Sequence, residues 1–113
     1  MISLPEPPKL GPPENYLHAI WFTAKEDEPI EWYDELDASR WSTRCVRKYR
    51  DGRLEAFSYA GDNWRDNMPG SSLPLVEVIN QNPAFFVREI SRDEFEDAWS
   101  EATSQMGSTK RGT

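Results

Sequence analysis

The chain has 113 residues, of which 37% are hydrophobic and 12% aromatic, and its formal net charge is −7. This length fits one domain with a modest core, and aromatic side chains, which bury roughly 150–250 Å² each, can supply that core. The acidic balance disfavours general nucleic-acid binding and adsorption to anionic membranes, but it permits a protein partner with a basic surface.

Cysteine content and hydropathy exclude further classes of protein. Cys45 is the single cysteine, so neither an intrachain disulfide nor a cysteine-based metal cluster can form. No stretch approaches the roughly 20 apolar residues of a membrane span, and the N-terminus lacks a secretory pattern. We therefore expect a cytoplasmic protein that carries no cofactor.

Both ends of the chain differ in composition from its middle. Residues 1–14 contain five prolines, which predicts a flexible lead and leaves open a role as a ligand for an aromatic groove. Residues 107–113, with the sequence GSTKRGT, are predicted to form a disordered tail. A single domain is therefore expected over residues 15–106.

Apolar runs, alternation and turn residues predict four strands in the first half of the chain. They cover residues 16–23, 30–36, 40–50 and 53–59. In the second of these strands, alternation places Trp32 and Asp34 on one face and Tyr33 and Glu35 on the other.

An Asp51-Gly52 turn joins the third and fourth predicted strands. Asp-Gly between two strands is a strong signal for a two-residue hairpin loop. Such a loop would set opposite charges and an aliphatic–aromatic pair across from one another, which stabilises a sheet. The expected pairs are Lys48 with Glu55, Val46 with Phe57 and Tyr49 with Leu54.

The second half of the chain predicts a loop, a short helix and one more strand. Residues 60–72 are rich in Gly, Asn and Asp and are expected to form a long loop around Trp64. A short helix is favoured at residues 73–80, and a fifth strand is predicted at residues 85–90.

A capping box from Ser91 to Glu94 predicts the start of a final helix. Its apolar face comprises Phe95, Ala98, Trp99, Ala102 and Met106, which recur at helical spacing. The order of elements predicts an α+β fold: an antiparallel β-sheet of about five strands, with the short helix and the C-terminal amphipathic helix packed on one face.

Catalytic patterns are weak in this sequence. We interpret His18, which lies within an apolar strand, as packed or hydrogen-bonded, because no nucleophile or orienting carboxylate lies at a suitable spacing. Cys45 lies between Arg44 and Arg47, and such cations can lower the pKa of a thiol, but we interpret it as a small buried residue. A small enzyme that uses either residue with a carboxylate is the least favoured hypothesis.

Small size, acidity and a surplus of Trp and Tyr favour a non-catalytic, acidic protein-binding module of the immunity or antitoxin type. Aromatic residues are frequent interface anchors, and carboxylates beside them would meet a basic partner. The candidate partner-binding residues are Trp32, Tyr33, Asp34, Glu35, Asp37 and Trp64.

A basic hairpin suggests nucleic-acid binding as the alternative function. Residues 40–53 contain six bases and one acid, whereas residues 25–37 contain seven acids and one base. Bases interleaved with aromatic residues suit a single-stranded nucleic acid. The candidate residues for this function are Arg44, Arg47, Lys48, Arg50 and Arg53. We favour the competing interpretation, in which the bases pair with the neighbouring acids across two strands.

Three stretches of the chain resemble a family of small, mostly bacterial domains of unknown function. They are residues 29–37 leading into Arg40-Trp41, the segment VRKYRDGR at residues 46–53, and the segment EISRDEFE at residues 89–96 followed by Trp99. The resemblance covers residues 16–103, and its elements are a hairpin turn, a capping box and core aromatic residues. It therefore implies a fold and no catalytic residues.

Overall fold

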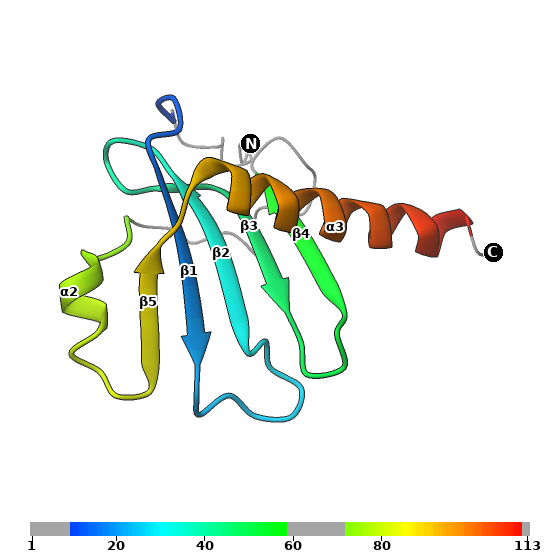
Figure 1. Ribbon diagram of the computed structural model, residues 1–113, viewed down its shortest axis with the longest axis horizontal. Helices are drawn as coiled ribbons and strands as arrows, with labels where there is room; N and C mark the ends of the chain where they lie inside the picture. Colours follow the sequence, from blue (N-terminus) through cyan, green and yellow to red (C-terminus); the bar gives the residue numbers. More distant parts are fainter. Residues whose placement is uncertain (1–9, 59–71, 112–113) are drawn as a thin grey trace, which may run out of the picture.

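The computed structural model describes residues 10–58 and 72–111, with side chains up to residue 106. Within these residues five strands form one antiparallel sheet in the order β4-β3-β2-β1-β5 (Figure 1). The strands are β1 (Asn15–Trp21), β2 (Glu31–Leu36), β3 (Ser42–Lys48), β4 (Leu54–Ser58) and β5 (Phe85–Glu89). The helices are α2 (Val76–Ile79) and α3 (Arg92–Arg111). The predicted α+β fold, with its antiparallel sheet, short helix and C-terminal helix, is confirmed.

Three predicted segments lie partly outside the described residues. The parts outside are residues 1–9 of the proline-rich lead, residues 60–71 of the long loop with Trp64, and residues 112–113 of the tail. Residues 10–14 lead into β1, and the Gly11 amide donates to Asp37 Oδ2 at 3.1 Å. α3 continues to Arg111, so the expected domain boundary at residue 106 lies inside this helix.

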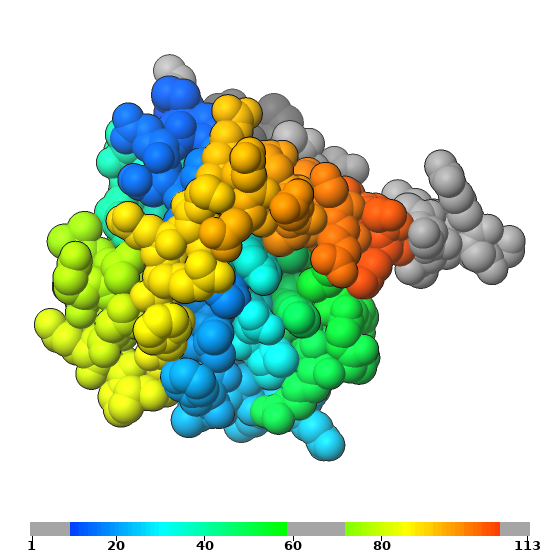
Figure 2. Space-filling view, in the orientation of Figure 1, coloured from blue at the N-terminus to red at the C-terminus, as the bar shows by residue number. Residues whose placement is uncertain are grey.

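Among the described elements, α3 packs on one face of the sheet and α2 on the other, so the two helices do not share one face as the sequence predicted. The cluster under α3 contains Val46, Leu54, Ala56 and Ala102. The cluster under α2 contains Leu17, Leu36 and Val87, with Val76 and Ile79 packed against it. Alternation along the strands makes both faces apolar, so each face needs a cover. α3 crosses one end of its face, and β1 and β2 remain visible below it (Figure 2).

The β3–β4 hairpin has a different register from the one that the sequence predicted. Arg47 faces Glu55, and Val46 faces Ala56, so every partner is shifted by one residue. The loop has three residues rather than two: the Tyr49 amide donates to the Arg53 carbonyl at 3.0 Å, and Gly52 has a φ of 88°. A tight turn followed by a left-handed glycine is the usual three-residue hairpin.

This shift exchanges the two faces of β4. A one-residue slip moves every side chain of a strand to the other side of the sheet. Phe57 therefore lies opposite Cys45, on the α2 side, while Leu54 and Ala56 pack under α3. The longer loop is favoured because it buries Leu54 and Ala56 against the larger helix.

Replacing Gly52 with alanine is expected to lower the free energy of unfolding by about 1–2 kcal/mol, because a side chain disfavours the left-handed conformation. No atom lies within 4 Å of the added methyl group, so backbone strain alone should account for the loss. Urea denaturation measures it. Gly11→Ala is the matched control: its methyl group would make only ordinary contacts, the nearest at 3.8 Å from Asp37 Cβ, and stability should change little. Equal effects of the two variants would contradict the prediction.

Side chains cover backbone groups at both edges of the sheet. On β4, the Leu54 amide donates to Gln105 Oε1 at 3.0 Å, and the Ala56 amide contacts Met106 Sδ at 3.3 Å. On β5, the Asn80 side chain accepts from the Val87 amide at 2.7 Å and donates to its carbonyl at 2.8 Å. Covered edges disfavour the addition of a strand from another chain.

Arg44 of β3 ties α3 to the sheet. Its guanidinium donates to both carboxylate oxygens of Glu35, at 2.9 and 2.6 Å, and it also contacts Glu96 of α3. The same group lies 4.9 Å from the Phe95 ring centroid and 4.8 Å from that of Trp99. A single side chain therefore joins β2, β3 and α3 through ion pairs and cation–π contacts.

Candidate functional site

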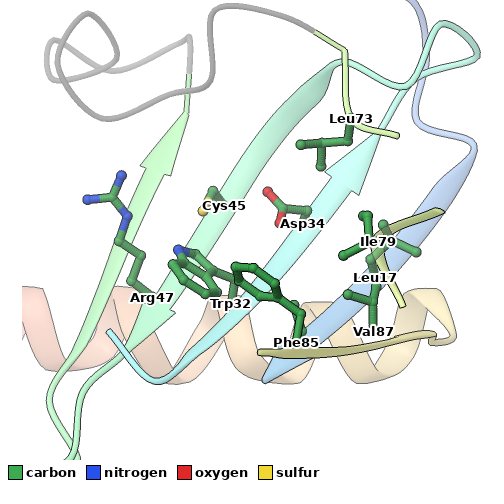
Figure 3. Close-up of a pocket in the computed structure, with 10 residues that line it drawn as sticks. Leu17, Trp32, Asp34, Cys45, Arg47, Leu73, Ile79, Phe85 and Val87 are labelled. Carbon is green, nitrogen blue, oxygen red and sulfur yellow. The ribbon is translucent and has the colours of Figure 1, made fainter. Parts of the chain in front are cut away.

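A cavity of about 320 Å³ lies on the α2 face of the sheet (Figure 3). It is lined by Leu17, Ala19, Trp32, Asp34, Cys45, Arg47, Leu73, Ile79, Phe85 and Val87. These residues come from β1, β2, β3, β5 and α2, and from the segment before α2. Most of the lining is apolar, with a few polar groups, and its volume is at the lower end of the range for ligand pockets. We therefore take this cavity, here called the α2 pocket, as the candidate site.

Asp34 is the acidic residue that lines the α2 pocket. Burial raises the pKa of its carboxyl group above the ordinary value, and the Ser42 and Cys45 hydrogen bonds and the Arg47 charge offset that effect only in part. The Ser42 hydroxyl donates to Asp34 Oδ1 at 2.8 Å. A carboxyl group held where its charge is disfavoured lowers stability, and such groups are frequent at functional sites.

Replacing Asp34 with asparagine is expected to raise the midpoint of thermal unfolding at neutral pH, since it removes a charge whose burial opposes folding. Because the pKa is raised in the folded state, the penalty is absent below the unfolded-state pKa of about 3.9 and grows as the pH rises above it. The gain should therefore shrink as the pH is lowered toward about 4. Glu77→Gln, which alters an exposed carboxylate of α2, is the control and should have little effect. A lower midpoint for Asp34→Asn at every pH would contradict the prediction.

Cys45 faces the α2 pocket directly opposite Asp34 in the register of β2 and β3. Burial and the neighbouring Asp34 carboxylate raise the pKa of its thiol well above the ordinary value. The thiolate is the nucleophilic form of cysteine, so this environment disfavours nucleophilic catalysis. Cys45 is buried, as the sequence predicted.

His18 points to the other face of the sheet, away from Cys45, so the two residues cannot act as a pair. Arg88 Nε donates to His18 Nδ1 at 3.2 Å, which places the imidazole proton on Nε2, 2.7 Å from Glu31 Oε1. The ring also stacks on Tyr33, with a centroid distance of 4.6 Å. The buried, hydrogen-bonded histidine expected from the sequence is confirmed.

The structure separates the predicted partner-binding residues of β2 by face. Trp32 and Asp34 line the α2 pocket, where Trp32 packs near Phe85 with a ring-centroid distance of 6.4 Å. Tyr33 and Glu35 point to the opposite side, under α3. Of these four residues, only Trp32 and Asp34 are brought together in a cavity.

The remaining predicted partner-binding residues either support the fold or lie outside the residues that the structure describes. Asp37 is buried and accepts hydrogen bonds from the amides of Gly11, Ser39 and Trp41, at distances between 2.9 and 3.1 Å. The carboxylates of Asp37 and of Glu35 are therefore held by intramolecular partners. Trp64 lies outside the residues that the structure describes.

The bases predicted for nucleic-acid binding are dispersed rather than gathered. Arg44 is held by Glu35, and Lys48 Nζ lies 3.7 Å from Glu31, so the predicted pairing of the basic and acidic strands is confirmed at these two points. Arg47 lies on the other face of the sheet. The remaining two predicted bases, Arg50 and Arg53, lie at the hairpin tip. Arg50 donates to the Ala24 carbonyl, and the Arg53 guanidinium lies 4.1 Å from the Tyr49 ring centroid.

Sequence reasoning did not identify most of the pocket wall. Leu17, Val87 and Phe85 were predicted strand residues, but nothing local indicated that β5 returns to pair with β1. That pairing, with α2 packed beside it, creates the wall. The alternation along β1 and β5 was the only available signal, and it becomes informative only once the two strands are known to be neighbours.

Within residues 10–58 and 72–111, no three His, Cys, Asp or Glu side chains come together as a metal site. None of the helices in the same ranges is long and apolar enough to cross a membrane.

The fold and the cavity define a small α+β domain with an antiparallel sheet and a ligand-sized pocket on one face. The chain belongs to the family described as domain of unknown function (DUF6881), which matches residues 15–104. The resemblance inferred from the sequence is thus confirmed at the level of a domain of unknown function. Comparison with curated proteins and with solved structures gave no match.

Proposed function

We propose that the domain is a non-catalytic binding module for another protein with a basic surface, of the immunity or antitoxin type, acting in the cytoplasm. The observation that supports this best is the α2 pocket, in which an aromatic anchor, Trp32, and a carboxyl group, Asp34, share a mostly apolar hollow that Arg47 also lines. A partner side chain that enters such a hollow loses its water and gains packing, which is how interface hot spots arise.

The surface charge supports a basic partner. On α3, Asp93, Asp97 and Glu101 are exposed and four residues apart, so they form a stripe on the side of the helix opposite Phe95. Such a field raises the rate of encounter with a basic protein more than it strengthens the final complex. Covered sheet edges favour recognition through side chains over strand addition.

The chemistry of the polar groups favours binding over catalysis. The Cys45 thiol is held in its protonated form, and His18 is on the other face, bonded to Glu31 and Arg88. The nucleic-acid alternative requires the hairpin bases to act as one surface. Because two of them pair with acids and Arg47 points to the other face, no observation favours that alternative.

A pocket-blocking experiment tests this function. Tagged full-length chain is incubated with lysate of its native host, retained proteins are identified by mass spectrometry, and the strongest basic candidate is purified and titrated. Ala19→Phe and Leu73→Trp are designed to fill the α2 pocket, and Ser100→Phe adds the same kind of bulk to the exposed side of α3. Thermal unfolding confirms that each variant is folded.

We expect the purified partner to bind wild type and Ser100→Phe alike, and the two pocket variants at least about ten-fold more weakly, or about 1.4 kcal/mol. Affinity should fall with added salt. If the partner is a toxin, its co-expression with wild type, but not with the pocket variants, should restore growth. A partner that binds all four proteins equally, or the absence of any reconstituted complex, would reject the proposal.

A further inference from the structure

Several of the groups around Asp34 are apolar and cannot offset its charge. Leu17, Val87 and Ile79 form the wall on its β1–β5 side, and Leu73 approaches it from the segment before α2 (Figure 3). An ionised carboxylate in such surroundings is costly unless a cation or several hydrogen bonds accompany it. Among the described residues that line the pocket, Arg47 is the only one that could supply the compensating positive charge.

Arg47 supplies only part of that charge. Its guanidinium lies 4.7 Å from the Phe57 ring centroid, and in Figure 3 it lies on the far side of Cys45 from Asp34. The charge of Arg47 lowers the pKa of Asp34 but does not cancel the effect of burial, which raises it.

The pocket walls suit an alkyl chain that ends in a cation. A lysine side chain can lay its four-carbon stem along apolar surface while its charged end reaches a polar group. The aromatic faces of Trp32 and Phe85 add favourable contacts for such a group. An uncharged apolar side chain would fill the same walls but would add no positive charge beside Asp34.

The hydrogen bonds of Asp34 favour an ammonium over a guanidinium group. A guanidinium binds best when both carboxylate oxygens are free to accept its two parallel N–H groups. Here Oδ1 already accepts from Ser42 at 2.8 Å, and the Cys45 thiol is a further donor. A compact ammonium needs only the remaining acceptor positions.

We infer that the α2 pocket receives a lysine side chain of the partner protein, with its stem on the apolar walls and its ammonium against Asp34. This inference rests on the proposed function and specifies the residue that the partner contributes.

Three small probes test the inference with the full-length chain. They are Nα-acetyl-lysine amide, Nα-acetyl-arginine amide and Nα-acetyl-norleucine amide, which share a backbone and differ at the end of the stem. Amide and indole signals of Trp32, Cys45 and Ala19 are followed by NMR during titration. We expect the lysine probe to bind about ten-fold more tightly than the norleucine probe, and more tightly than the arginine probe.

Two variants separate pocket binding from general attraction to an acidic protein. Asp34→Asn should reduce the affinity of the lysine probe to that of the norleucine probe. Glu77→Gln makes an equal charge change on the exposed side of α2 and should leave the affinity of the lysine probe unchanged within about two-fold. Asp34→Asn retains an acceptor for Ser42 and should remain folded, which its thermal midpoint verifies.

Equal affinity of the lysine and norleucine probes, no binding of any probe, or unaltered lysine binding by Asp34→Asn would overturn the inference. If this occurs while pocket-blocking variants still abolish binding of the partner protein, the proposed function stands and only the occupant is wrong. If the partner ignores the pocket-blocking variants, the proposed function itself is rejected.

Discussion

Replacing Arg44 with methionine is expected to lower the free energy of unfolding by about 3–5 kcal/mol, since it leaves a buried carboxylate without its cation. Glu35 is 4% exposed, and Arg44 donates to both of its oxygens. The same variant removes the cation that lies over the Phe95 and Trp99 rings. Urea denaturation followed by tryptophan fluorescence measures the loss.

Two further variants show whether the stranded charge is the cause. Adding Glu35→Gln to Arg44→Met removes the uncompensated charge and should recover part of the loss. Arg53→Met, at the exposed hairpin tip, is the matched control and should change stability by no more than about 0.5 kcal/mol. The explanation fails if the double variant is no more stable than Arg44→Met alone.

The pH dependence of stability gives an independent check on the same pair. Burial by itself would raise the pKa of Glu35, but the hydrogen bonds from Arg44 and Thr43 outweigh burial, and the net pKa is lowered. A lowered pKa contributes stability above the unfolded-state value, about 4.3, which is lost as the pH falls through the folded-state value. Glu35→Gln should therefore flatten the acid limb of the stability curve.

Truncating Phe95 to alanine is expected to destabilise the domain by about 3–5 kcal/mol, because it empties a fully enclosed site between α3 and the sheet. Phe95 is 0% exposed, and its ring lies 5.4 Å from Tyr16 and 6.3 Å from Trp99, centroid to centroid. Loss of its ring removes both of these ring contacts. Thermal and urea unfolding both report the effect.

Phe86→Ala provides the comparison for this truncation. Phe86 lies on β5 and is 47% exposed, so its removal should change stability by no more than about 1 kcal/mol. Arg44 and Phe95 are in contact, so their losses should be non-additive in a double-mutant cycle. Equal costs for Phe95→Ala and Phe86→Ala would show that α3 is not anchored at this point.

Local sequence patterns predicted the elements of this fold well. The capping box places Ser91 just before α3, and the Ser91 hydroxyl accepts from the Glu94 amide at 3.1 Å. Alternation in β2 placed Trp32 and Asp34 on one face, and it was right because side-chain direction in a strand depends only on neighbouring residues. The apolar period of the last helix likewise gave its buried face, with Phe95 and Ala102 fully enclosed.

Longer-range features did not follow from local patterns. The Asp51-Gly52 signal identified the hairpin but not its loop length, because two-residue and three-residue loops both use a left-handed glycine. The one-residue difference between them sets which face of β4 is buried. Burial of Leu54 and Ala56 under α3 decides between them. Both Glu35 and Asp37, proposed for a partner, instead serve Arg44 and three backbone amides.

The sequence by itself determined the strands, the helices, the α+β class and the pairing of opposite charges between the second and third strands. Only the tertiary structure decided that β5 returns beside β1, that α2 covers the face opposite α3, and that Asp34 therefore stands in an apolar pocket. The physical reason is that secondary structure depends on neighbours along the chain. Burial depends on which distant elements meet, and the pKa of a carboxyl group follows its burial.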